Sequence, residues 1–196
     1  MKKIIMETLV LAALATGQAY AAPISLDNAT VTATYHGAAD GMLGLDAGYQ
    51  PGPGSNTSHV DPTVTGIEFI SGDYLFAFDF TADGLLTVYN NMPLPTDGSP
   101  DYRFRFDFGN TLPAPIGSFA LVDGSMVDGL PGLSVIDGHS IALDLNGLAW
   151  NGDFTSFTAR IGAAEAPAGD VPEPASLALT MLGLTGLAVA SRGKAR

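Results

Sequence analysis

Two short stretches decide the fold: Tyr74-Leu-Phe-Ala-Phe-Asp-Phe80 and Tyr102-Arg-Phe-Arg-Phe-Asp-Phe108. In both, an aromatic side chain occupies every second position, and the positions between hold aliphatic or charged residues. A period of two places alternate side chains on the same face of a β-strand. We therefore expect two strands, each with a buried aromatic row, and we expect the two rows to face each other in one core.

The surrounding sequence predicts more strands separated by tight turns. Alternating or β-branched segments occupy residues 29–36, 64–70, 85–90, 118–122, 140–145 and 154–161. Asp-Gly pairs recur between them, and such pairs favour turns because Asp bonds local backbone and Gly accepts a positive φ. This pattern indicates an all-β fold, a single antiparallel β-sandwich or jelly-roll-like domain over residues 22–162. The alanine-rich residues 163–170 are expected to form a linker.

Charge and cysteine content narrow the classes of partner. The chain carries 8 basic and 20 acidic residues, a net charge of −12, and it has no cysteine. Residues 22–170 hold only three basic residues, all arginine, and have a formal charge of −15. Such a charge repels nucleic acid, so we expect no nucleic-acid partner. Without cysteine the core depends on burial alone.

The N-terminus has the three parts of a secretion signal. Lys2 and Lys3 provide a positive start, residues 9–15 are apolar, and Ala19 and Ala21 match the small-x-small pattern that signal peptidase cleaves. We therefore expect residues 1–21 to be a signal peptide that is removed after Ala21.

The C-terminus, residues 171–196, has a different three-part order. The triplet Pro172-Glu173-Pro174 precedes an uncharged apolar run over residues 175–190. As a helix this run reaches roughly 24 Å at about 1.5 Å per residue, just short of the ~30 Å hydrocarbon core of a bilayer. The basic residues that follow favour the cytoplasmic side of a membrane; they are Arg192, Lys194 and Arg196. The pattern predicts a short transmembrane helix with the main domain outside the cytoplasm.

These C-terminal features, in this order, resemble the PEP-CTERM sorting domain, also labelled the ice-binding protein C-terminal domain. The resemblance covers about an eighth of the chain, and the basic end is more widely spaced here than in the family. It implies recognition by an exosortase, a membrane protease of Gram-negative bacteria that cuts near the Pro-Glu-Pro motif. It also implies a transient inner-membrane anchor, then a place at the cell surface or in the exopolysaccharide or biofilm matrix.

A long polar segment, residues 37–61, is the predicted place for a ligand, because it is poor in strand-forming sequence and long loops are often functional. Its candidate binding residues are Asp40, Asp46, Tyr49 and Asp61. Trp150, Tyr49 and Tyr89 are candidates for stacking on a sugar, although core packing is the favoured role for Trp150. Thr30, Thr32 and Thr34 alternate on one side of a strand, and we interpret them as an ordinary solvent-facing row.

Motifs for catalysis or tight metal binding are weak. His36, His59 and His139 are scattered, which argues against zinc, and no Gly-x-Ser-x-Gly elbow supports acyl transfer. Calcium at an Asp-rich turn stays open, since hard cations take oxygen ligands. We therefore expect a secreted or surface-displayed non-enzymatic protein without a required cofactor, which acts in the exopolysaccharide or biofilm matrix and has extracellular polysaccharide as a candidate partner. The alternatives are a calcium-dependent adhesive or carbohydrate-binding module and a secreted hydrolase.

Overall fold

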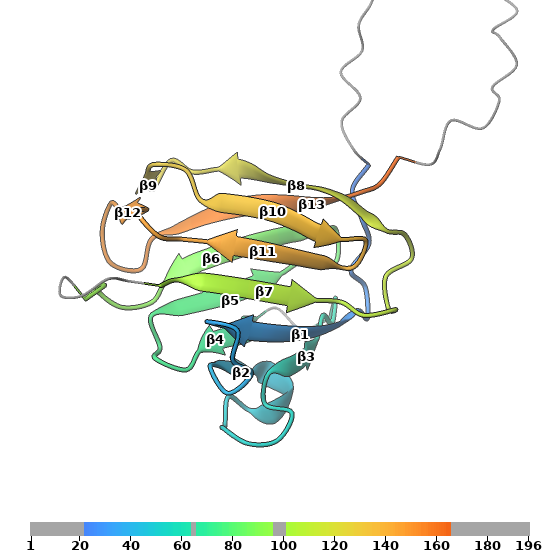
Figure 1. Ribbon diagram of the computed structural model, residues 1–196, viewed down its shortest axis with the longest axis horizontal. Helices are drawn as coiled ribbons and strands as arrows, with labels where there is room; N and C mark the ends of the chain where they lie inside the picture. The colour runs from blue at the N-terminus through green and yellow to red at the C-terminus, as the bar shows by residue number, and fades with distance from the viewer. Residues whose placement is uncertain (1–21, 64–65, 96–100, 166–196) are drawn as a thin grey trace, which may run out of the picture.

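The computed structural model describes residues 22–63, 66–95 and 101–165 and is built of antiparallel β-sheets (Figure 1). Its single helical element within those ranges is a short 3-10 turn, Leu45–Ala47. The prediction of an all-β fold is therefore confirmed. None of the helices in the described part of the chain is long and apolar enough to cross a membrane.

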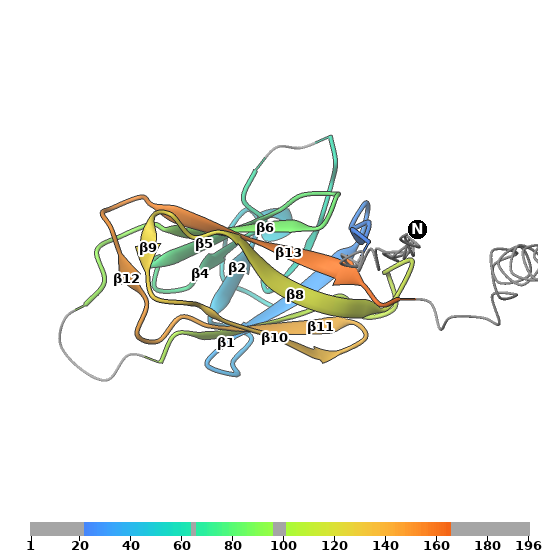
Figure 2. The ribbon, with the colours of Figure 1, turned by 90° about the horizontal axis from the view of Figure 1, so that it is seen from above.

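Two larger sheets and one small ribbon make up the fold. The five-stranded sheet has the order β10 (Gly132–Asp137), β11 (Ser140–Asp144), β7 (Arg103–Asp107), β1 (Thr30–Tyr35) and β3 (Thr57–His59). The six-stranded sheet has the order β2 (Met42–Gly44), β4 (Phe69–Ser71), β5 (Phe76–Phe80), β6 (Leu85–Asn90), β13 (Ser156–Ala163) and β8 (Ile116–Asp123). The ribbon pairs β12 (Ala149–Trp150) with β9 (Val127–Asp128) at one end (Figure 2).

The core lies between the two larger sheets and consists largely of the two aromatic rows. Phe78 on β5 contacts both Phe104 and Phe106 on β7, with ring centroids 4.8 and 5.1 Å apart. All three side chains are buried. Edge-to-face and tilted ring pairs of this kind add to the stabilisation from area burial. The predicted meeting of the two rows is confirmed for these members.

Tyr74 is an exception to the predicted row. Its side chain is 50% exposed and its φ is 64°. The strand begins at Phe76, because Asp73 Oδ1 accepts a hydrogen bond from the Leu75 N–H and holds the preceding residues in a turn. The prediction that Tyr74 belongs to the buried face is wrong, since local turn formation outweighs the alternating pattern there.

Five of the other six predicted strands are found with ends shifted by two residues or fewer, and residues 85–90 match β6. The strand expected over 64–70 is the exception, because β4 occupies only Phe69–Ser71. β10 was not predicted, because Gly132 and the exposed apolar Ile136 interrupt a simple alternation. The prediction that residues 37–61 form one long loop is wrong, because they contain β2, the 3-10 turn and β3. β2 is an edge strand of the six-stranded sheet, and β3 is an edge strand of the five-stranded sheet.

Several predictions concern segments outside the described residues. They are the signal peptide with Ala19 and Ala21, most of the linker 163–170, the motif Pro172-Glu173-Pro174, the apolar helix, and the basic residues Arg192, Lys194 and Arg196. These remain predictions from the sequence.

Candidate functional site

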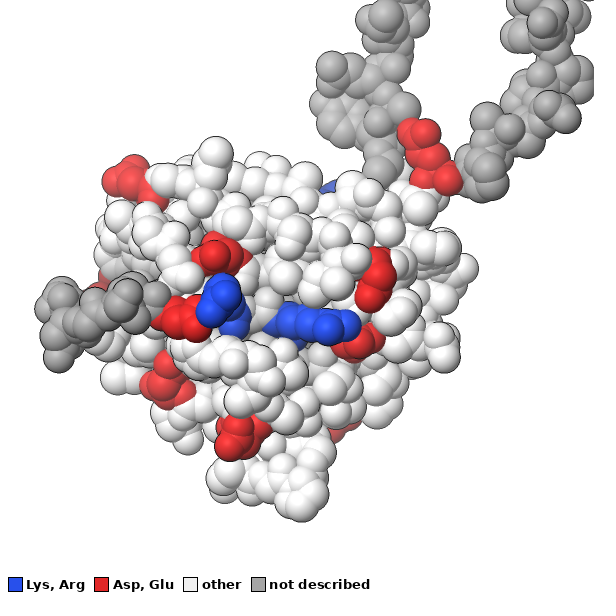
Figure 3. All heavy atoms as spheres, viewed as in Figure 1, with Lys and Arg blue, Asp and Glu red and all other residues white. Residues whose placement is uncertain are grey.

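The solvent side of the five-stranded sheet carries two of the three arginines of residues 22–170. Phe104 and Phe106 on β7 point into the core, so the alternation of the strand turns Arg103 and Arg105 outward. Their side chains are 65% and 45% exposed. Figure 3 shows basic side chains at the centre of this side of the molecule with acidic ones around them. We call this surface of β1, β7 and β11 around Arg103 and Arg105 the arginine face.

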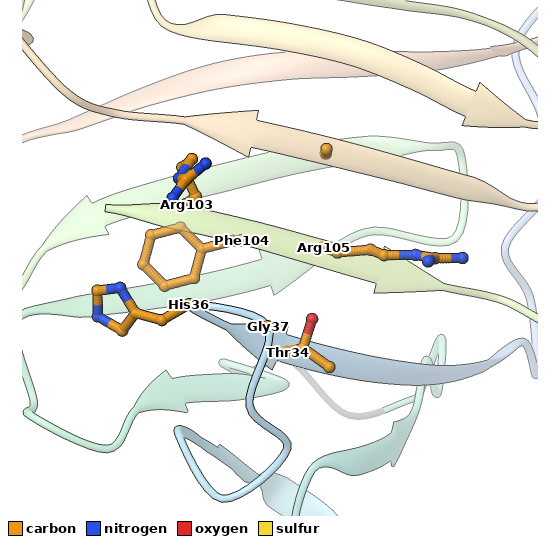
Figure 4. Close-up of a pocket in the computed structure, with 7 residues that line it drawn as sticks. Thr34, His36, Gly37, Arg103, Phe104 and Arg105 are labelled. Atoms are coloured by element: carbon orange, nitrogen blue, oxygen red, sulfur yellow. The ribbon is translucent and has the colours of Figure 1, made fainter. Parts of the chain in front are cut away.

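The arginine face is hollowed rather than flat. A shallow hollow of about 340 Å³ lies over β1 and β7, where Thr34, His36 and both arginines surround it (Figure 4). Two further hollows adjoin it, one towards β10 and β11 and one towards Thr32 and Asp107. The register explains the continuity, because Thr34, Arg105 and Ala142 are direct cross-strand partners on β1, β7 and β11. Residues distant in sequence thus form one open surface that carries both apolar and charged groups.

At one end of the face, Asp101 holds Arg103 in place. Arg103 donates to both carboxylate oxygens of Asp101, from Nε at 2.5 Å and from Nη2 at 2.8 Å. His36 Nδ1 lies 3.5 Å from the same carboxylate. The hydrogen bonds from Arg103, helped by His36, lower the pKa of Asp101 to about 2. The two hydrogen bonds to Asp101 therefore orient the guanidinium group of Arg103. Among the contacts of the described residues, none involves Arg103 Nη1.

At the other end, four side chains form a small network. Arg105 Nη2 donates to Ser140 Oγ at 3.1 Å and to Asp107 Oδ2 at 3.3 Å. His139 Nδ1 lies 3.2 Å from Asp107 Oδ1. Burial acts to raise the pKa of Asp107, but hydrogen bonds from the Gly109 N–H and His139, together with Arg105, outweigh it and lower that pKa. The carboxylate is therefore held in its charged form.

Ser140, His139 and Asp107 include the residue types of a catalytic triad, but their geometry differs from one. Ser140 Oγ and Asp107 Oδ1 both approach the same ring nitrogen, His139 Nδ1, at 3.3 and 3.2 Å. A relay needs the base to bond the nucleophile through one nitrogen and the orienting carboxylate through the other. Ser140 is also fully buried. The cluster therefore does not have the geometry of a nucleophile bonded to its base.

The charge balance of the arginine face favours an uncharged ligand. Asp144 on β11 is the direct cross-strand partner of Arg103 on β7. The carboxylate of Asp137 is close enough to Arg105 for the two charges to interact. With Asp101 and Asp107, four carboxylates therefore surround two guanidinium groups. An acidic polymer would gain little binding energy on such a surface, because the carboxylates would repel it. Hydroxyl groups both donate and accept hydrogen bonds, so they can bond the guanidinium donors and the carboxylate acceptors alike.

The four residues predicted to bind a ligand do not converge on one point. Asp46 contacts His59 Nδ1 and accepts from Ser58 Oγ, and the Tyr49 hydroxyl donates to the Ile67 carbonyl. Asp61 Oδ1 accepts from the N–H and hydroxyl of Thr63, 2.8 and 2.7 Å away, which is a local turn. Asp40 is exposed in the connection between β1 and β2. Asp46 and Tyr49 thus make contacts that hold the 37–61 segment in place, whereas Asp61 stabilises the turn that follows it.

The aromatic and threonine candidates have clearer outcomes. The ring of Trp150 packs against Phe76 and Phe157, with centroids 6.0 and 5.9 Å away, so the core-packing role is confirmed. Thr32 is exposed on the arginine face, and its hydroxyl lies 3.2 Å from that of Thr57 on β3. The threonine row faces solvent, as expected.

The sequence did not predict that one titratable residue, Glu68, would be buried. Glu68, just before β4, is only 3% exposed, and its Oε2 accepts a hydrogen bond of 2.6 Å from the Phe80 N–H. Burial raises the pKa of this carboxyl to about 7. Its neighbours in sequence, Ile67 and Phe69, are apolar, which is the only local signal of its burial.

Within residues 22–63, 66–95 and 101–165, no three or more His, Asp or Glu side chains lie close enough together to hold a metal ion. Comparisons of the chain with protein-family models, with curated proteins and with solved structures gave no match.

Proposed function

We propose that this chain is a non-enzymatic extracellular protein that binds a neutral, hydroxyl-rich polysaccharide on its arginine face. In this proposal the two larger sheets form a jelly-roll-like β-sandwich. A signal peptide cleaved after Ala21 exports the chain, and an exosortase-type protease processes it at Pro172-Glu173-Pro174. The mature protein then acts at the cell surface or in an exopolysaccharide matrix.

One observation carries the binding part of the proposal. In a region with 18 acidic and three basic residues, two of the basic residues stand side by side over adjoining hollows, each oriented by a carboxylate. Oriented guanidinium and carboxylate groups bind hydroxyl groups in fixed directions, because the side chains are ordered before the ligand arrives. A broad open surface suits a polymer better than a small molecule, which requires enclosure.

The binding test uses the full-length mature domain and two polymers. Dextran is the neutral probe and alginate the carboxylated one, and affinity electrophoresis measures retardation by each. We expect retardation by dextran that changes little with salt, since screening weakens only charge–charge attraction. Arg103→Gln combined with Arg105→Gln should weaken it roughly tenfold, the effect of losing one or two hydrogen bonds.

The third arginine provides the matched control. Arg160 lies on β13 of the other sheet, where Nη1 donates to the Asp83 carbonyl at 3.0 Å. Arg160→Gln should leave dextran retardation unchanged. Equal loss in this variant and in the double variant would refute the arginine face as the binding surface.

The export part of the proposal has its own test. Intact mass would be measured on protein from the membrane, surface and medium fractions of the native host. A species that begins near Ala22 and ends near Pro172, found at the surface or in the medium, is the expected result. A chain that keeps Arg196 in the inner membrane would contradict processing.

A further inference from the structure

A separate hollow lies away from the arginine face, beside β12. β9 and β12 lie together at one end of the sheets (Figure 2). The hollow has a volume of about 290 Å³. Asn90, the last residue of β6, and Trp150 of β12 border it from two different strands. Leu94, Leu148 and Ala149 supply apolar lining, and Asp153 lies at its border.

Two side chains that border this hollow each have one buried polar atom without a hydrogen-bond partner. Asn90 Oδ1, an acceptor, and Trp150 Nε1, a donor, are the only buried side-chain nitrogen or oxygen atoms in the described part of the chain without a hydrogen bond. Asn90 is 2% exposed, and its Nδ2 donates to the Gly152 carbonyl at 3.3 Å, which leaves Oδ1 as the free end of the amide. Buried polar groups are nearly always paired, so two orphans at one hollow require an explanation.

The two orphans are chemically complementary to a single kind of group. A hydroxyl accepts from an indole N–H and donates to an amide oxygen at the same time. A saccharide ring also has C–H groups, which pack on apolar side chains such as Leu94 and Leu148. We propose that this hollow, which we call the Asn90–Trp150 pocket, binds one sugar residue through a hydroxyl placed between Asn90 Oδ1 and Trp150 Nε1.

Binding in this pocket requires a small rearrangement. Both atoms are shielded from solvent, so a ligand hydroxyl reaches them only after side chains at the rim move. Side-chain rotation of this kind is common on binding. The inference is independent of the proposed function, because it uses none of the residues of the arginine face and holds wherever the protein is located.

The test follows from the composition of the chain. Trp150 is the single tryptophan, so selectively excited tryptophan fluorescence reports on the surroundings of this one side chain. The mature domain would be titrated with glucose, galactose, mannose and N-acetylglucosamine as separate probes. We expect at least one of them to change the Trp150 emission in a saturable manner in the millimolar range, the affinity usual for one or two new hydrogen bonds on an open site.

Variants then locate the binding. Ala149 is exposed and lines the pocket, so Ala149→Leu fills it while leaving Trp150 as reporter. It should weaken the affinity at least tenfold. Asn151→Leu adds the same side chain two residues away, outside the lining, and should bind as the parent does. Trp150→Phe keeps the core ring but removes the N–H, and calorimetry should show a similar loss.

Two outcomes would overturn the inference. If none of the four sugars changes the emission beyond its effect on free N-acetyltryptophanamide, the Asn90–Trp150 pocket is not a sugar-binding site. If a sugar binds equally well to Ala149→Leu, it binds elsewhere. Arg103→Gln with Arg105→Gln should leave this binding intact, which separates failure here from failure of the arginine face.

Discussion

The buried carboxyl of Glu68 makes stability depend on pH in an unusual direction. Burial raises its pKa from the ordinary 4.5 to about 7, the nearby charge of Asp79 adds to the rise, and the hydrogen bond from the Phe80 N–H opposes it. The folded state therefore binds a proton more tightly than the unfolded state does. Between pH 4.5 and 7 the free energy of unfolding should fall as pH rises, because the folded chain holds more protons.

The size of this effect follows from the pKa difference. One pKa unit corresponds to 1.36 kcal/mol, so a rise from 4.5 to about 7 corresponds to about 3 kcal/mol. The full stabilisation is present below pH 4.5, and it is lost once pH passes 7. Carboxyls with lowered pKa values, such as Asp61, Asp83 and Asp137, act oppositely and lose their stabilisation at lower pH. Stability should therefore be greatest on the acidic side of neutrality.

Glu68→Gln removes the titration and keeps an acceptor for the Phe80 N–H. Urea unfolding at pH 4.5 and at pH 8 gives the difference between variant and parent at each pH. We expect that difference to shift in favour of the variant by about 3 kcal/mol between the two pH values. Any constant cost of the glutamine cancels in this comparison. Glu165→Gln, at an exposed position after β13, is the matched control and should show no shift. Parallel pH profiles of parent and Glu68→Gln would refute the reasoning.

Further predictions concern the core and one turn, each measured by urea unfolding. Phe106→Ala, at a fully buried ring that packs against three other phenylalanines, should lower the free energy of unfolding by about 3–5 kcal/mol. Phe154→Ala, at a ring that is 74% exposed, should cost little; equal costs would contradict the core described above. Gly84 has φ +84°, and a Cβ there would lie 2.8 Å from the Ile161 carbonyl oxygen. Gly48 is the control, because its φ is +60° but open space surrounds it, so Gly48→Ala should cost only the roughly 1 kcal/mol of backbone strain. Gly84→Ala should lower the free energy of unfolding by more than Gly48→Ala does. A smaller loss at Gly84 than at Gly48 would refute the steric argument.

Much of the fold was predictable because it depends on local alternation. Every second residue of β5 and β7 is aromatic, and a strand with one apolar face must bury it against another layer. The exposed Arg103 and Arg105 follow from the same alternation. By contrast, β9 and β12 contain two residues each, too few for any period to be recognised. Tyr74 shows that a turn overrides alternation at the end of a strand.

The candidate sites could not be predicted in the same way. The arginine face joins β1, β7 and β11, which are separated by long stretches of chain, and only the register places Thr34 beside Arg105. The Asn90–Trp150 pocket likewise joins the end of β6 to β12. Sequence alone determined the strand pattern, the acidic charge and the expected export signals, because each is carried by neighbouring residues. Tertiary structure alone decided which polar groups meet, are buried or lose their partners, because these depend on contacts between strands far apart in the chain.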